Sequence, residues 1–264
     1  MLELKKIDKY YNPGTVNEMC LFDGFDLTVA DGEFVSVVGS NGSGKTSMLN
    51  ILCGSIPVDG GKILMNGKDI TNKKEFKRNR NIGRVYQNPS MGTCPSMTIL
   101  ENMSLADNKG KFFGLGAGIN KARREEYREM LSQLGLGLEN KMDVKVGVLS
   151  GGQRQRVWIT MALCQGTKTL FLDETTTYLD IRYQIEILQL VKKLNQEFGI
   201  TIIMVLHDIN QAIAYSDNVI GMKDGKVLVE GDPEEVITEE SIRELYGIEL
   251  GVTRVDGRKF VLVV

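Results

Sequence analysis

The chain has 264 residues, enough to bury a full hydrophobic core, and its 42% hydrophobic and 25% charged residues are ordinary for a globular protein. A net charge of −2 gives no basic surface of the kind that nucleic-acid binders carry, so we expect no nucleic-acid partner. The four cysteines form no C-x-x-C pair, which disfavours a disulfide scaffold or a zinc site and favours a reducing compartment.

Up to Tyr86, extended stretches surround one helix, which is typical of an α/β domain. The pair Asn66 and Gly67 between apolar stretches indicates a two-residue hairpin turn. The expected strands, hairpin and helix are, in chain order, Leu2–Ile7, Cys20–Val29, Phe34–Val38, the helix Lys45–Cys53, the hairpin Lys62–Ile70 and Ile82–Tyr86.

The middle of the chain changes to helices. Thr98 and Glu101 form a capping box that opens one helix, and apolar residues at i, i+3, i+4 and i+7 predict another over Asn120–Leu134. Gly110–Gly118 predicts a glycine-rich loop between them. We therefore interpret Met91–Val148 as a helical insertion in the α/β domain.

From Gln153 the alternation of helices and strands resumes. Asp224-Gly225 and Asp256-Gly257 are expected to be the turns of two hairpins. The expected elements are a helix from Gln153 to Leu163, strand Thr169–Leu172, helix Asp180–Phe198, strand Thr201–Leu206, helix Asp208–Ser216, hairpin Val219–Val229, helices Pro233–Ile237 and Glu239–Tyr246, and hairpin Gly251–Val264.

A glycine-rich segment joins an apolar strand to a helix and fits the pattern G-x-x-x-x-G-K-[ST]. It consists of Gly39, Ser40, Asn41, Gly42, Ser43, Gly44, Lys45 and Thr46. Its backbone N–H groups and the helix N-terminus can surround a phosphate chain. We expect Lys45 to reach the β- and γ-phosphates of ATP and the Thr46 hydroxyl to bind Mg²⁺. The alternative is a glycine-rich turn that only caps a core helix, and kinases and GTPases share the motif.

An acidic pair, Asp173 and Glu174, follows the apolar strand Thr169–Leu172. In an open parallel sheet, ligands bind beyond the carboxyl ends of the strands. We expect Asp173 to hold Mg²⁺, directly or through water, and Glu174 to orient or deprotonate the attacking water. An isolated Asp-Glu pair is more often a solvated loop, but behind a P-loop the functional interpretation is favoured.

A second anion site is predicted at the start of the helix that carries Arg154 and Arg156. There a hydroxyl, two glycines and exposed N–H groups can approach a phosphate closely. This segment consists of Leu149, Ser150, Gly151, Gly152 and Gln153. Together with the P-loop and the acidic pair, it resembles the signature of the ABC ATPase family.

The resemblance covers essentially the whole chain. It implies one ABC ATPase domain, with a P-loop NTPase core and a mainly parallel sheet, an antiparallel β subdomain and a helical insertion subdomain. The expected core with its β subdomain takes residues 1–90 and 153–264, and the helical subdomain takes 91–152 and ends in the signature. In such proteins, the signature of one subunit faces the ATP held by the P-loop of its partner, so a homodimer is expected.

The resemblance also assigns roles residue by residue. Gln87 corresponds to the Q-loop glutamine that senses metal and water, and His207 to the switch histidine that contacts the γ-phosphate. Asp180 closes the D-loop of the dimer interface, which also includes Thr177, Tyr178 and Leu179. Tyr11 is expected to stack on adenine, although the adjacent Tyr10 is an alternative. Thr175 departs from the family, which usually has proline after the catalytic glutamate.

The resemblance implies an ATP-hydrolysing motor, in the first place that of an importer, with transmembrane permease subunits and a substrate-binding protein as partners. The sequence shows no secretory signal and no run near the ~18 apolar residues of a membrane helix. A cytoplasmic protein, peripheral on the inner face of the membrane, is therefore expected. An exporter motor and a non-transport ABC ATPase remain the alternatives.

The family branch that the sequence resembles changes near Val157. The part before it resembles one importer branch, and the part after it resembles ATPases for iron-siderophores, haem or cobalamin. This difference suggests a chimera of two branches.

Overall fold

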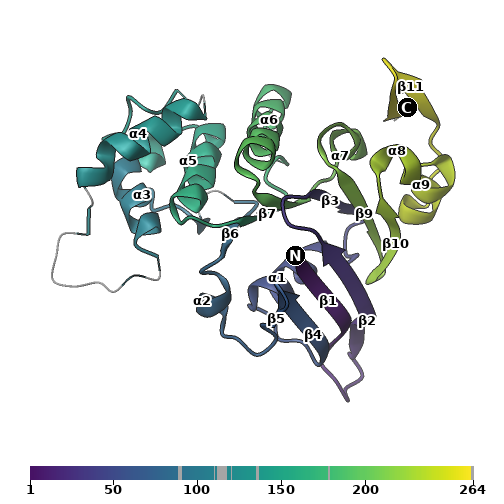
Figure 1. The fold of residues 1–264 in the computed structure, drawn as a ribbon. Helices are drawn as coiled ribbons and strands as arrows, with labels where there is room; N and C mark the ends of the chain where they lie inside the picture. The colour runs from purple at the N-terminus through teal and green to yellow at the C-terminus, as the bar shows by residue number, and fades with distance from the viewer. Residues whose placement is uncertain are drawn as a thin grey trace.

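A computed structural model describes residues 1–88, 91–109, 111, 118–119, 121–134, 137–177 and 179–262 (Figure 1). Its centre is a six-stranded sheet of order β10-β9-β3-β8-β7-β6, in which all strands except β10 run parallel. The strands are β3 (Phe34–Gly39), β6 (Ile82–Val85), β7 (Thr169–Asp173), β8 (Thr201–Val205), β9 (Asn218–Lys223) and β10 (Lys226–Gly231). The predicted mainly parallel sheet is thus confirmed.

A second sheet is antiparallel and has the order β2-β1-β4-β5. Its strands are β1 (Leu2–Tyr11), β2 (Met19–Val29), β4 (Gly60–Met65) and β5 (Lys68–Asp69). Helix α1 (Lys45–Cys53) lies between the two sheets (Figure 1). Its apolar residues are almost fully buried there, so α1 and the loop before it are held from both sides.

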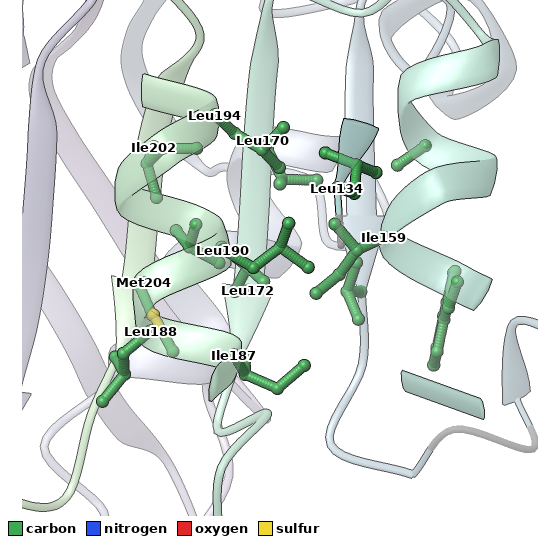
Figure 2. Close-up of a cluster of buried hydrophobic side chains, with 14 of the residues drawn as sticks. Leu134, Ile159, Leu170, Leu172, Ile187, Leu188, Leu190, Leu194, Ile202 and Met204 are labelled. Carbon is green, nitrogen blue, oxygen red and sulfur yellow. The ribbon is translucent and has the colours of Figure 1, made fainter. Parts of the chain in front are cut away.

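The other face of the central sheet is covered by α6 (Ile181–Phe198) and α7 (Ile209–Tyr215) (Figure 1). Strands β3 and β8 are buried along their whole length, as expected for parallel strands covered on both faces. In Figure 2, the α6 side chains Ile187, Leu190 and Leu194 pack against the strands and α5. Their labelled neighbours are Leu170, Leu172, Ile202, Met204 and Ile159.

Helices gather at one end of the central sheet, where the helical insertion is predicted (Figure 1). They are α3 (Ile99–Asp107), the 3-10 turn η2 (Lys121–Arg123), α4 (Arg124–Gln133), the 3-10 turn η3 (Val146–Val148) and α5 (Gly151–Cys164). The capping box of Thr98 and Glu101 is confirmed. Asn120 and most of the predicted Gly110–Gly118 loop lie outside the described residues.

The C-terminal part contains α8 (Pro233–Val236), α9 (Glu239–Tyr246) and a hairpin of β11 (Val252–Val255) and β12 (Arg258–Val261). The three predicted two-residue turns are confirmed. In each, Asn66, Asp224 or Asp256 precedes a glycine, and both residues have positive φ, as this type of turn requires. In the described part of the chain, no helix is both long and apolar enough to cross a bilayer.

One short helix was not predicted. It is α2 (Glu75–Arg78), whose last residue is buried against the end of α1. Arg78 donates hydrogen bonds from Nη1 to the carbonyl oxygens of Ile51 (2.7 Å) and Leu52 (3.4 Å). The guanidinium thereby satisfies carbonyl groups at the C-terminus of α1.

Candidate functional site

The predicted site residues come from neighbouring strand ends. The P-loop follows β3, His207 follows β8 after one residue, Asp173 ends β7, and Gln87 follows β6 after one residue. Because β3, β8, β7 and β6 are adjacent and parallel, their carboxyl ends meet at one edge of the sheet. A cleft of about 760 Å³ opens at this edge, lined by Tyr11, Met19, Leu21, Asn41, Gly42, Gly44, Lys45, Thr46, Ser47, Gln87, Glu174, Thr177 and His207.

Three P-loop glycines, Gly39, Gly42 and Gly44, have positive φ, and two of them also lie close to other atoms. Gly39 has φ 139°, and a Cβ there would lie 2.0 Å from the carbonyl oxygen of Met222 on β9. Gly44, the N-cap residue of α1, has φ 102° and lies against the ring of Phe22. No side chain of the described residues caps this helix end. Its N–H groups and partial positive charge are therefore suited to an anion.

Lys45 is buried, with 5% of its surface exposed, and braces the loop that precedes it. Its Nζ donates to the carbonyl oxygens of Gly39 and Ser40, each at 2.8 Å, and to Ser43 Oγ at 3.5 Å. Burial lowers the pKa of Lys45, and the carboxylate of Glu174 opposes this shift. The structure thus gives Ser40 and Ser43 supporting roles beside Lys45, and neither of them lines the cleft.

Asp173 is buried and does not itself line the cleft, but it contacts Thr46, which does. The Thr46 hydroxyl donates to Asp173 Oδ1 at 3.0 Å, and Arg84 Nη2 lies 3.1 Å from Asp173 Oδ2. Hydroxyl and carboxylate oxygens are the ligands that Mg²⁺ prefers, and Mg²⁺ usually combines one or two carboxylates with substrate phosphates. Among the described residues, no three acidic, His or Cys side chains form a metal cluster of their own. Thr46 and Asp173 therefore fit a Mg²⁺ that is shared with a nucleotide.

Two nitrogen atoms lie against a single oxygen of Glu174, and Gln87 donates a hydrogen bond to it. Gln87 Nε2 and His207 Nε2 each lie 2.9 Å from Glu174 Oε2. The described residues place no hydrogen bond on Oε1, which stays available as an acceptor. The three side chains come from three strand ends, so the sheet itself fixes their meeting point.

The backbone at Glu174 has φ +50°, an uncommon value for a non-glycine residue and one that marks local strain. Thr177 holds this turn, because both its N–H (3.3 Å) and its hydroxyl (3.1 Å) donate to the Glu174 carbonyl oxygen. Thr175, at the position where proline is usual, is buried, and its hydroxyl finds no partner among the described residues. The departure from proline thus buries a hydroxyl group that no described residue satisfies.

One part of the cleft lining is apolar. Tyr11, Met19 and Leu21 line it, whereas Tyr10 does not. This distribution favours Tyr11 over Tyr10 as the residue that faces a base. Met19 and Leu21 were not singled out from the sequence. Their position at the start of β2, opposite the end of β1, depends on strand register.

The predicted signature residues lie elsewhere, at the N-terminus of α5, and do not line the cleft (Figure 1). Ser150 and Gln153 form a capping box: Ser150 Oγ accepts from the Gln153 N–H at 3.3 Å, and Gln153 Oε1 accepts from the Ser150 N–H at 3.1 Å. Since Ser150 Oγ acts as an acceptor there, its hydrogen is free to donate. Gly151 is open around its Cβ position, but a Cβ on Gly152 would lie 3.0 Å from the ring of Tyr183.

Asp180 also acts as a cap. It is the N-cap residue of α6, and its Oδ1 accepts from the Tyr183 N–H at 3.1 Å. The D-loop residue Tyr178 lies outside the described residues. The structure thus gives Asp180 a local role, while its predicted place in a dimer interface stays a prediction.

Known proteins match most of this chain. The family model for ABC transporters matches residues 22–177. The tyrosine transport ATP-binding protein of Clostridioides difficile (strain R20291) is 38% identical over 248 residues, which cover 93% of this chain and 98% of the relative. The petrobactin import ATP-binding protein FpuC of Bacillus anthracis is 38% identical over 237 residues, covering 89% of this chain and 85% of the relative.

The fold agrees with solved structures. The dimeric post-hydrolysis state of the ATP-binding cassette MJ0796, bound to ADP and Pi, has a TM-score of 0.75 and 33% identity, and the match covers 88% of this chain and 99% of that one. Both aligned relatives extend over both sides of Val157, so the comparisons give no support to a chimera of two branches. The family match, these relatives and the shared cleft geometry show that the chain belongs to the ABC transporter family of ATP-binding subunits.

Proposed function

We propose that this chain is the ATP-hydrolysing motor of an ABC importer. The observation that carries the proposal is the meeting of Gln87 and His207 on one oxygen of Glu174, in the same cleft as Lys45 and Thr46. A phosphate-binding loop and a positioned carboxylate are the parts that hydrolysis of a phosphoanhydride needs. The printed names of the relatives, tyrosine transport and petrobactin import, favour uptake over export.

In the proposed reaction, the P-loop and Lys45 bind the phosphates of ATP. Oε1 of Glu174, the oxygen without a donor, accepts a proton from the attacking water. Gln87 and His207 hold the carboxylate through Oε2, so that its other oxygen keeps one direction. The water oxygen forms a bond to the γ-phosphorus, the bond to the β-phosphate oxygen breaks, and ADP and phosphate are released.

Thr46 and Asp173 are the residues that we assign to Mg²⁺. When bound, Mg²⁺ offsets the negative charge that spreads over the phosphate oxygens during transfer. The 3.0 Å hydrogen bond between Thr46 and Asp173 keeps the two ligands together, so the protein needs little rearrangement to use both. Gln87, also predicted to contact the metal, is turned towards Glu174.

The signature is assigned to a second copy. Ser150, Gly151, Gly152, Gln153 and Asp180 are exposed or partly exposed helix ends away from the cleft of their own chain, apart from the buried Gly152. In a homodimer, they would complete the site of the partner, as the dimeric MJ0796 cassette suggests. Residues 1–90 and 153–264 are assigned to the core and 91–152 to the helical subdomain. The remaining partners are transmembrane permease subunits and a substrate-binding protein, and this chain itself is assigned to the cytoplasmic face of the membrane.

The experiment is the substitution Glu174→Gln. The amide keeps the shape of the side chain but cannot take up the proton, so ATP binding is expected to persist while steady-state ATPase falls by roughly 10²-fold or more. Binding is measured with a fluorescent ATP analogue and turnover by phosphate release. Glu240→Gln, on the exposed side of α9, is the matched control. Wild-type turnover in Glu174→Gln would show that another group accepts the proton.

A further inference from the structure

A buried ion pair connects the metal-binding side of the cleft to the edge of the sheet. Arg84 on β6 and Asp173 at the end of β7 lie on adjacent parallel strands, and Arg84 Nη2 is 3.1 Å from Asp173 Oδ2. Only 7% of each side chain is exposed. A charged pair this deep interacts strongly, because little water screens it.

Arg84 has no other acidic contact in the described part of the chain. Its guanidinium lies 4.4 Å from the ring centroid of Tyr86, which supports one face of the group. The thiol of Cys53 is also close, but burial raises the pKa of Cys53 to about 11, so the thiol is neutral. The positive charge of Arg84 is therefore directed at Asp173 alone among the described carboxylates.

The two oxygens of Asp173 are divided between two partners. Oδ2 faces Arg84, and Oδ1 faces the Thr46 hydroxyl at the cleft. The carboxylate can rotate little without breaking one of these contacts. It thus presents a single oxygen to the side where Thr46 and the nucleotide phosphates lie, and the guanidinium offsets part of its negative charge.

We propose that Arg84 is a positioning residue that sets the Mg²⁺ affinity of the ATP site, by holding Oδ2 of Asp173 and weakening the carboxylate's attraction for the cation. The inference rests on the proposed function, in which Asp173 and Thr46 bind Mg²⁺. A fixed positive charge near a cation site disfavours the cation. Arg84 therefore makes Mg²⁺ binding weaker and more easily reversed than Asp173 alone would.

The test compares Arg84→Met, which removes the charge at similar length, with Arg84→Lys, which keeps it. Binding of the slowly hydrolysed analogue ATPγS is followed by fluorescence at fixed nucleotide concentration while MgCl₂ is titrated in a metal-buffered solution. In Arg84→Met, we expect half-maximal binding at a Mg²⁺ concentration roughly fivefold lower than in the wild type. Arg84→Lys is expected to stay near the wild-type value, because the charge is retained.

A half-saturating Mg²⁺ concentration that is unchanged or higher in Arg84→Met overturns the inference. So does an equal shift in Arg84→Lys, because loss of local packing would then account for both. If Arg84→Met does not fold, as judged by thermal unfolding, Arg84→Gln takes its place with the same expected decrease. A wild type whose ATPγS binding does not depend on Mg²⁺ would instead contradict the proposed function.

Discussion

Two helix N-termini in this chain begin with similar glycine-rich sequences but are built differently. The N-terminus of α1 follows Gly44 and has no side-chain cap among the described residues. The N-terminus of α5 follows Ser150 and is closed by the reciprocal hydrogen bonds of a capping box. Both present N–H groups and partial positive charge, but a side chain accepts from a first-turn N–H only at α5, where Ser150 caps Gln153.

The N-terminus of α1 has no side-chain cap and depends on a ligand to fill that place, whereas the N-terminus of α5 is capped without a ligand. The loop before α1 is held by Lys45 and by two sheets, so the open helix end stays in place without a cap. The end of α5 is stabilised by its own sequence and lies partly exposed. This arrangement suits a surface that must keep its shape until a second subunit arrives.

The largest effect is expected at the open helix end. Lys45→Ala removes the cation that faces the phosphates and also three hydrogen bonds to the loop. We expect ATP affinity to fall by roughly 10²-fold or more, since hydrogen bonds to charged groups contribute about 1.5–3 kcal/mol each. Fluorescence titration with an ATP analogue measures the change, and Lys62→Ala at an exposed position of β4 is the control. Retained affinity would show that the backbone alone binds the phosphates.

A second substitution examines the closed helix end. Ser150→Arg places a bulky side chain on the signature, so ATP binding is expected to persist while ATPase is nearly lost. Mixing this variant with Lys45→Ala creates heterodimers in which one site has both defects and the other has neither. ATPase should reappear and increase with protein concentration. The control is Ser132→Arg on the exposed surface of α4.

No recovery of ATPase in mixtures that crosslinking shows to contain the heterodimer would contradict two independent shared sites. Wild-type ATPase per chain that does not change with protein concentration would point instead to hydrolysis within one chain.

Stability should also distinguish the two helix ends. Gly44→Ala forces a Cβ into a left-handed conformation at 3.1 Å from the Phe22 ring, which is expected to cost about 1–3 kcal/mol. Gly151→Ala adds a methyl group whose nearest contact is Leu179 at 3.9 Å, at a helical position without positive φ. Its unfolding midpoint should equal or slightly exceed that of the wild type. Equal unfolding midpoints for both variants would contradict the conclusion that the backbone requires glycine at position 44 but not at position 151.

The smallest expected effect concerns the cap itself. Ser150→Ala removes the acceptor for the Gln153 N–H and should lower the free energy of unfolding by about 1 kcal/mol. For a chain of this size, the unfolding midpoint should fall by about 2–4 °C. Ser150→Thr keeps the acceptor and should restore most of the loss. Thermal unfolding of the wild type, Ser150→Ala and Ser150→Thr without nucleotide measures the contribution of the cap to stability, separately from any role of Ser150 in hydrolysis.

The sequence was sufficient where one local signal decided the structure. The Asn-Gly and Asp-Gly turns, the capping box at Thr98 and the strand before the P-loop are examples, because each depends on a few neighbouring residues. Gln87 and His207 lie in the cleft with Glu174, while their roles in hydrolysis stay predictions. Their assignment used the resemblance to a family, since a lone histidine at a strand end gives no such indication.

Other parts of the site depend on contacts between distant segments. Met19 enters the cleft through the register of β1 and β2, and Thr177 through the turn after Glu174. From the sequence, Arg84 is only a polar residue in a short strand. Its contact with Asp173 depends on the pairing of β6 with β7. The short helix α2 has no strong periodicity in four residues, and its anchoring role depends on where α1 ends.

The order of strands in the central sheet also affects how the chain folds during synthesis. Strand β3 pairs Phe34 with Ile202 on β8 and Val35 with Asn218 on β9, and it has no neighbour from nearer in the sequence. At about 5–20 residues per second, β3 waits roughly 10–30 s for its first partner to be synthesised. During that time, both edges of an almost wholly apolar strand are unpaired, which favours association with other chains. The strand that later carries the phosphate-binding loop is therefore the one that most needs protection by a chaperone on the ribosome.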